Sequence, residues 1–330
     1  MLEALNHNNE HILAKNAIKN VDYYCPYCHS KLILKKGIKV MPHFAHESQS
    51  QRWCAKGESE LHYHAKYQLA TMLKRLGYTV RIEPFYKLIN QLPDIVVNDK
   101  IALELQFSMI SLSKIRLRSD GLNSIGLHPI WIVKDIKYDK SKMMLSLSDF
   151  QASTIDCETK RLLTWNEQDK SPIVYSDIQH IGGKTFKARR QTLINYLDKA
   201  NKLSHSSNTI YKLSNQKILK YIQRCRWKNS VLESTLSAMY QLQLFEDKVA
   251  YKVGFIVPHQ IYIKTHPIEW QLQLLLLEKE KRLNYQYFEK CLDFRQFSNS
   301  TKAKIDIIKA IIMEYQYAIN LNSKDVQIIY

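Results

Sequence analysis

The sequence predicts a mixed α/β protein with a small metal-binding module, an α/β core and a mostly helical C-terminal region. A Cys-x2-Cys pair at Cys25 and Cys28 precedes a predicted β-hairpin. Between residues 57 and 133, helical and strand patterns alternate in the order helix, three strands, helix, strand. From about residue 190 onward, helical periodicity dominates. We therefore expect three domains, at residues 1–56, 57–155 and 156–330.

The composition is that of a folded and strongly basic protein. Of the 330 residues, 45% are hydrophobic, which excludes general disorder. Lys and Arg outnumber Asp and Glu by 48 to 31, which gives a net charge of +17. This surplus favours nucleic acid as a partner, although a merely basic surface is the alternative. No stretch approaches the roughly 18 apolar residues of a membrane helix, and the start does not resemble a secretory signal, so we expect a cytoplasmic protein.

The N-terminal module carries a candidate zinc site, in a segment that reads CPYCHSKLILKKGIKVMPHFAHESQSQRWC over residues 25–54. The Cys-x2-Cys knuckle directs two thiolates to one place, and the predicted hairpin would deliver further ligands. Tetrahedral zinc takes four nitrogen or sulfur ligands. Five candidates compete for these places: Cys25, Cys28, His43, His46 and Cys54. A redox dithiol is the usual alternative, but no βαβ pattern surrounds this motif.

The core begins with a segment over residues 57–78 whose apolar spacing predicts an amphipathic helix, and Gly77 ends this helix. Glu58, His62 and Lys66 lie at positions i, i+4 and i+8, so they share one face of this helix. This face is either a solvated surface with weak ion pairs or part of a site.

Two strands of the core each contain one carboxylate within apolar sequence. We expect strands over residues 78–88, 93–97, 100–107 and 130–133, and a second helix over 111–125. Asp94 lies on the second strand and Glu104 on the third. A buried carboxylate is costly unless it is paired, hydrogen-bonded or bound to a metal. Either the two acids face solvent on half-exposed strands, or they converge on one cation.

The order and spacing of these motifs resemble the competence protein CoiA family, whose core is similar to the PD-(D/E)XK nuclease superfamily. The family pattern joins a CPxC knuckle, an HFAH segment, an ES-x-x-H-x-x-x-K helix, a strand-borne Asp, an I/L-E-x-Q-x-S strand and a W-I strand. Here these motifs occur at Cys25–Cys28, His43–His46, Glu58–Lys66, Asp94, Glu104–Ser108 and Trp131-Ile132. The resemblance covers about a third of the chain. It implies a restriction-endonuclease-like (PD-(D/E)XK) core with a zinc-ribbon-like module.

The resemblance also implies a catalytic site formed by Glu58, Asp94, Glu104, Gln106 and Lys66. Asp94 and Glu104 would share a Mg2+ or Mn2+ ion that polarises a phosphodiester and activates water. Gln106 occupies the lysine position of the superfamily pattern, and although glutamine is usual in this family it carries no charge. An arginine often found just before the strand aspartate is absent, because Gln91-Leu92-Pro93 stands there. Arg118 sits where the family places an arginine on the next helix.

The C-terminal region supplies further candidate nucleic-acid-binding residues, in one dense basic cluster and along one face of a predicted helix. With Arg118, they are Lys184, Lys187, Arg189, Arg190, Lys217, Lys220, Arg224 and Lys228. Such a helical stripe can follow a phosphate backbone, or it can be the solvated face of an amphipathic helix.

The leading hypothesis is a Mg2+-dependent DNA nuclease that acts in natural transformation and recombination, a setting that the resemblance alone implies. Structural zinc and catalytic Mg2+ or Mn2+ are the expected cofactors. Single-stranded or branched DNA and recombination proteins are the expected partners. The alternative is a non-catalytic DNA-binding scaffold with a nuclease-like fold that assists recombination. The carboxylates disfavour a third hypothesis, a zinc-ribbon regulator of transcription.

Overall fold

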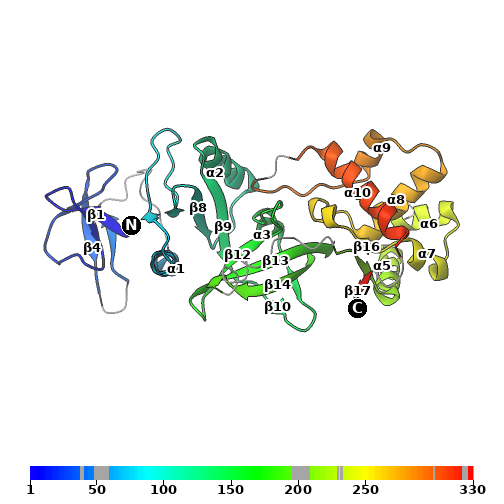
Figure 1. The fold of residues 1–330 in the computed structure, drawn as a ribbon, viewed down its shortest axis with the longest axis horizontal. Coiled ribbons are helices and arrows are strands. Elements are labelled where there is room, and N and C mark those ends of the chain that lie inside the picture. The colour runs from blue at the N-terminus through cyan, green and yellow to red at the C-terminus, as the bar shows by residue number, and fades with distance from the viewer. Residues whose placement is uncertain are drawn as a thin grey trace. The chain divides into compact units, whose positions relative to one another are not determined.

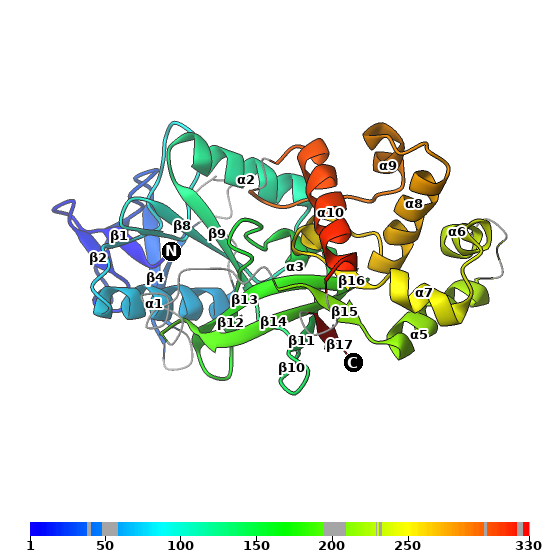
Figure 2. The same ribbon diagram turned by 45° about the vertical axis from the view of Figure 1, so that its right-hand side comes forward.

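The computed structural model describes residues 1–37, 41–47, 59–194, 209–228, 230, 233–299, 302–321 and 326–329. The chain divides into two compact units. The first unit comprises residues 1–135, 162–174 and 191–196, and the second comprises residues 136–161, 175–190 and 197–330. The expected boundaries near residues 56 and 155 stay predictions. Figures 1 and 2 show the elements of both units.

The first unit begins with a five-stranded antiparallel sheet in the order β2-β1-β3-β4-β5. Its strands are β1 (Glu3–Leu5), β2 (His11–Leu13), β3 (Tyr23–Tyr24), β4 (Lys31–Lys35) and β5 (His43–His46). Tyr23, Leu32 and Phe44 belong to a small core of its own. The predicted hairpin is confirmed as β4 and β5, which pair antiparallel.

The α/β core of the first unit follows the predicted order of elements. It contains α1 (Glu60–Arg75), β6 (Val80–Ile82), β7 (Ile95–Val97), β8 (Ile101–Gln106), α2 (Leu112–Ser124), β9 (His128–Lys134) and β12 (Leu162–Asn166). The strands lie in the order β12-β9-β8-β7-β6. Strands β6 to β8 pair antiparallel, whereas β9 pairs parallel with both β8 and β12. The mixed α/β class is therefore confirmed.

The two helices of this core cover opposite faces of the sheet. Successive strand residues point to opposite faces, and neighbouring residues of β7 pack against different helices. Ile95 and Leu103 pack in one core with Leu69 of α1. Val96 packs in another with Leu122 of α2. Figure 2 shows α1 and α2 on the two sides of β8 and β9. Residues at the ends of β7 and β8 can therefore reach side chains from either helix.

The second unit combines strands with a helical C-terminal part. Strands β10 (Tyr138–Asp139), β11 (Met144–Ser146), β14 (Thr185–Thr192) and β13 (Ser171–Gly182) are neighbours in that order. Most of β13 and β14 belongs to this unit, which includes residues 175–190. A second sheet, ordered β16-β15-β17, comprises β15 (Tyr211–Leu213), β16 (Phe255–Ile256) and β17 (Gln327–Ile329). The helices are α3 (Asp149–Ser153), α5 (Asn215–Trp227), α6 (Ser234–Leu242), α7 (Glu246–Lys252), η1 (Pro258–Tyr262), α8 (Pro267–Lys279), α9 (Tyr285–Lys290) and α10 (Lys304–Ile319). In the described part of the chain, no helix is long and apolar enough to cross a bilayer.

Candidate functional site

Three of the predicted zinc ligands lie together in the N-terminal sheet. The Sγ atoms of Cys25 and Cys28 and a ring nitrogen of His46 all lie within 4.8 Å of one another. The Cys28 Sγ atom is 3.3 Å from His46 Nε2. The register of the β4–β5 hairpin pairs His46 with Leu32, which places the histidine at the knuckle end of the hairpin. Two thiols and one imidazole are a donor set that suits zinc.

His43 lies away from this cluster, for a reason that follows from strand geometry. It is three residues from His46 on the same strand, so the two side chains point to opposite faces. The His43 ring stacks on Tyr63, with ring centroids 4.9 Å apart. The fifth candidate, Cys54, lies outside the described residues. The structure thus groups Cys25, Cys28 and His46 and separates His43 from them.

The two knuckle thiols differ in acidity. Burial raises the pKa of the Cys25 thiol. Burial also acts to raise the pKa of Cys28, but hydrogen bonds with Ser30 and His46 outweigh it and lower this pKa to about 5. Cys28 is therefore a thiolate at neutral pH, the form that binds metals.

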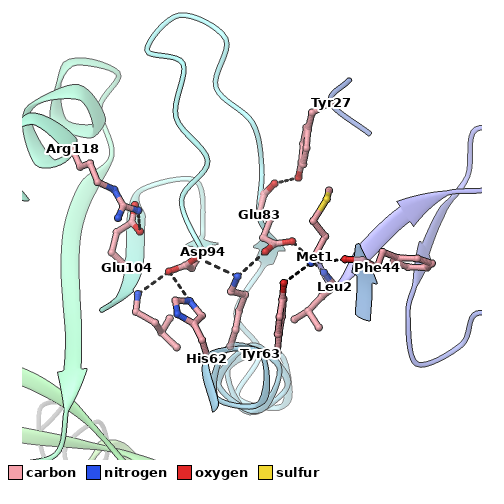
Figure 3. Close-up of polar contacts among 12 residues, drawn as sticks. Met1, Leu2, Tyr27, Phe44, His62, Tyr63, Glu83, Asp94, Glu104 and Arg118 are labelled. Carbon is pink, nitrogen blue, oxygen red and sulfur yellow. Dashed lines mark hydrogen bonds and ion pairs between the residues drawn. The ribbon is translucent and has the colours of Figure 1, made fainter. Parts of the chain in front are cut away.

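Lys66 is the central cation of the α/β core. Ser59 caps α1 by accepting a hydrogen bond from the His62 backbone, and the helix presents Lys66 to the sheet. Lys66 is 0% exposed. Its Nζ atom lies 2.6 Å from Glu83 Oε1 and 3.2 Å from Asp94 Oδ1. The ammonium group thus lies within ion-pair distance of both carboxylates, which Figure 3 labels. A fully buried lysine requires such partners. The two ion pairs therefore hold the Lys66 face of α1 against Glu83 and Asp94.

Glu83 is a site residue that the sequence analysis missed. It follows β6, is 2% exposed and has a φ of 49°, which is uncommon outside glycine. Its Oε2 atom accepts a hydrogen bond from the Leu2 backbone at 3.2 Å. Its carbonyl accepts one from the hydroxyl of Tyr27, which belongs to the knuckle. The only signal in the sequence is an acid at the end of a short strand, because its partners come from distant segments.

Asp94 lies just before β7 and is bonded on both carboxylate oxygens. It is 1% exposed. Oδ1 faces Lys66, and Oδ2 accepts a hydrogen bond of 2.9 Å from the Leu105 backbone. The His62 Nε2 atom lies 3.3 Å from Oδ2. The carboxylate is thus held between α1 and β8, as Figure 3 shows.

Glu104 is compensated from the other helix. It lies on β8 and is 1% exposed, and Arg118 of α2 donates a hydrogen bond to its Oε2 atom. The Arg118 guanidinium also lies 5.0 Å from the ring centroid of Trp131, which pairs with Glu104 in the β8–β9 register. This arginine was predicted to contact nucleic acid, and here it contacts a buried acid.

The cluster borders a cavity of ≈ 710 Å³. Its lining includes His62, Asp94, Gln106, Arg118 and Lys134. The Gln106 side-chain amide donates to Ser108, with bonds of 2.9 Å to the carbonyl and 3.0 Å to the hydroxyl. The predicted residues Lys66, Asp94, Glu104 and Gln106 are therefore neighbours, while Glu58 lies outside the described residues.

Basic side chains from both helices compensate the acids of this cluster. Lys66 lies next to Glu83 and Asp94, and Arg118 contacts Glu104. Each of the three buried carboxylates therefore has a cationic partner, as burial requires. A further cation, Lys134, lines the neighbouring cavity.

The predicted nucleic-acid-binding residues of the second unit fall into two sets. The first set has partners: Lys187 lies over the Tyr211 ring, Arg189 pairs with Asp177, Arg190 donates to Tyr175, and Lys228 pairs with Glu233. The second set lines one cavity: Lys184, Lys217, Lys220 and Arg224.

Comparison with known proteins places both parts of the first unit in one family. Residues 5–54 match the N-terminal domain of competence protein CoiA, and residues 58–193 match its nuclease-like domain. Competence protein CoiA of Bacillus subtilis (strain 168) is 33% identical over 143 residues, which cover 42% of this chain and 37% of that relative. No solved structure matches the chain. Two successive domains of one family thus account for most of residues 5–193, and the chain belongs to the competence protein CoiA family.

Proposed function

We propose that this chain is a metal-dependent DNA nuclease that processes incoming DNA in natural transformation. Its core would be of the PD-(D/E)XK type, with a zinc-ribbon-like N-terminal module. One observation carries the proposal: Asp94 and Glu104, each 1% exposed, lie with Lys66 and Arg118 beside a cavity in the nuclease-like domain. Buried ionisable groups that interact with one another next to a cavity are typical of a catalytic site.

The residues of the cluster have separable roles in this proposal. Asp94 and Glu104 would hold a Mg2+ or Mn2+ ion, because carboxylate oxygens are the ligands that hard cations take. The ion would supply Lewis-acid activation of the phosphodiester and of a water molecule. Lys66 would provide the positive charge that Gln106 lacks, since its Nζ atom is 3.2 Å from Asp94 Oδ1. Gln106 would hold a water or phosphate oxygen by hydrogen bonding.

The test is cleavage of labelled single-stranded, duplex and branched DNA with Mg2+, with Mn2+ and with a chelator. We expect Asp94→Asn and Glu104→Gln each to lower the cleavage rate by roughly 100-fold or more, since electrostatic contributions of this kind are that large. Glu60→Gln is the matched control, because Glu60 is a half-exposed acid of α1. Cleavage that persists in both site variants, or in chelator, would refute the proposed site.

The alternative is a non-catalytic scaffold that binds DNA and assists recombination. It is favoured by a specific observation: Asp94 and Glu104 already have cationic partners in Lys66 and Arg118. If the protein binds DNA but no divalent ion supports cleavage of any of the three substrates, the scaffold is the better description.

For the N-terminal module we propose one structural zinc ion held by Cys25, Cys28 and His46, with Cys54 as the fourth ligand. The clustering of the first three supports this. Metal analysis should find about one equivalent per chain, and His46→Ala should lose it, because zinc binding and folding are linked in small modules. His43→Ala is the matched control and should keep the metal. Metal loss in the His43 variant alone would contradict the assignment.

A further inference from the structure

The second unit contains a cavity of ≈ 910 Å³ whose walls are rich in cations. It is lined by the β13–β14 turn, one face of α5, the segment before α8, and the end of α9 with the residues after it. Six basic residues contribute: Lys184, Lys217, Lys220, Arg224, Lys264 and Lys290. Two acids, Glu269 and Asp293, also line it. The cavity lies outside the candidate active site and draws residues from segments far apart in the sequence.

Most of these cations have no acidic partner among the described residues. Those on α5 differ in this respect from the other cations of that helix. Within the described ranges, no carboxylate lies within ion-pair distance of Lys217, Lys220 or Arg224. By contrast, Arg226 of α5 pairs with Glu246, and Lys228 at its C-terminal end pairs with Glu233. The protein therefore compensates Arg226 and Lys228, at the C-terminal end of α5, and leaves Lys217, Lys220 and Arg224 for an external anion.

The acids of the cavity are already engaged or outnumbered. Glu269 accepts hydrogen bonds from Ser234 at 2.5 Å and from Tyr221 at 3.4 Å. Burial lowers the pKa of Lys217, and crowding by the like charges of Lys142 and Lys187 lowers it further. A bound anion would relieve this crowding, because it favours the charged form of each lysine.

Three of the helical cations form a row. Lys217, Lys220 and Arg224 occupy positions i, i+3 and i+7 of α5, so they extend about 10 Å along the helix axis. A row of this length can contact more than one phosphate of a nucleic-acid backbone. Beside them, the rings of Tyr221 and His266 stack with centroids 3.8 Å apart. Cations next to aromatic rings in a concave site are typical of sites for single strands.

We propose that this cavity binds the phosphate backbone of a single nucleic-acid strand through Lys184, Lys217, Lys220 and Arg224. The inference rests on the proposal that the chain acts on nucleic acid, but it does not require cleavage. It adds Lys290 to the site, and it leaves out Lys264 and Lys228, which pair with Asp149 and Glu233.

The test compares two double variants of one helix, Lys220→Gln/Arg224→Gln and Arg226→Gln/Lys228→Gln, which remove the same charge. Fluorescence anisotropy with a labelled single-stranded oligonucleotide measures affinity at several salt concentrations. We expect the cavity variant to bind roughly tenfold more weakly and its salt slope to fall by about 1.4, since each lost phosphate contact removes about 0.7. The control variant should keep both quantities close to the wild-type values. Circular dichroism confirms that both variants are folded.

Each other outcome overturns the inference. Equal losses in the two variants would indicate a general charge effect. Unchanged affinity in the cavity variant would place the strand elsewhere, and if that variant instead loses binding of inorganic pyrophosphate, the cavity serves a small phosphate ligand. If the wild type prefers duplex over single-stranded DNA and the cavity variant loses this preference, the cavity is a duplex site. Asp94→Asn separates the two proposals: it should bind the oligonucleotide normally, whatever its cleavage rate.

Discussion

The candidate active site of the first unit and the basic cavity of the second unit both gather cations, but they compensate them in opposite ways. Lys66 is fully buried and lies between Glu83 and Asp94. Lys217 and Arg224 line a cavity at a partly exposed helix face without an acid partner among the described residues. A buried charge must be paired when the chain folds, whereas a hydrated cation is stable without a partner and can bind a ligand later. Burial, and not the number of cations, indicates which ones serve the fold.

The largest effect that tests this comparison is the loss of the buried cation. Lys66→Met leaves Glu83 and Asp94 buried without their partner, so we expect the free energy of unfolding to fall by about 3–5 kcal/mol. Urea unfolding measures it. Lys217→Met, the matched change in the cavity, should alter the free energy by less than about 0.5 kcal/mol, as surface substitutions do. Equal costs in the two variants would end the distinction.

The second test uses pH, because the second unit buries neutral imidazole where the first buries paired charge. Burial, and then Arg295, lowers the pKa of His180 to about 4, and its Nε2 atom bonds the Gly183 carbonyl at 2.8 Å. Below about pH 6.5 the unfolded chain gains a proton that the native histidine does not, so stability falls until about pH 4. At about 1.4 kcal/mol per unit of pKa, the loss is roughly 3 kcal/mol.

The measurement for this prediction is urea unfolding at pH 7, 5.5 and 4. His180→Gln keeps a donor for the Gly183 carbonyl but cannot titrate, so its pH dependence should be weaker than that of the wild type. His64→Gln, a change at a half-exposed histidine of α1, is the control and should leave the dependence unchanged. If His180→Gln shows the full wild-type dependence, another group is responsible.

The third test concerns the link between the Cys25–Cys28–His46 cluster and the carboxylate cluster. Tyr27 lies within the knuckle and donates to the carbonyl of Glu83, whose side chain holds Lys66. Tyr27→Phe leaves that carbonyl without its donor, so we expect a cost of about 1–2 kcal/mol. Tyr24→Phe, in the adjacent strand, is the control. A loss confined to the metal-bound protein would indicate that the metal positions Tyr27; no loss in either state would show that the bond contributes nothing.

Much of the fold could be predicted because its signals are local. The helix over Glu60–Arg75 has apolar spacing, a Ser59 cap and a Gly77 end with φ of 87°, and all three can be read from adjacent residues. The three-residue strands β1 and β2 could not be predicted, since segments so short carry no clear periodicity. Strand pairing stabilises them, and pairing depends on distant residues.

The site shows the same division. Asp94 and Glu104 were identified from the sequence, but a divalent cation was the expected compensation, and in the structure basic side chains also provide it. Lys66 comes from α1 and Arg118 from α2, so neither pairing can be read from local sequence. His43 and His46 could not be ranked either, because only the hairpin register shows which one meets the knuckle.

The smallest expected effect is also the most direct comparison, since it occurs within one helix. Lys217 is crowded by Lys142 and Lys187, so Lys217→Gln should raise the free energy of unfolding by a few tenths of a kcal/mol. Lys228→Gln should do the reverse, because it leaves the buried carboxylate of Glu233 without its cation. Thermal unfolding at low salt measures both changes. At about 1 M salt, where the Debye length is about 3 Å, the gain in Lys217→Gln should vanish, while the loss at the partly buried Lys228 pair should be only reduced. If the free energy of unfolding changes in the same direction in both variants, Lys217 and Lys228 do not differ in how the protein compensates their charge.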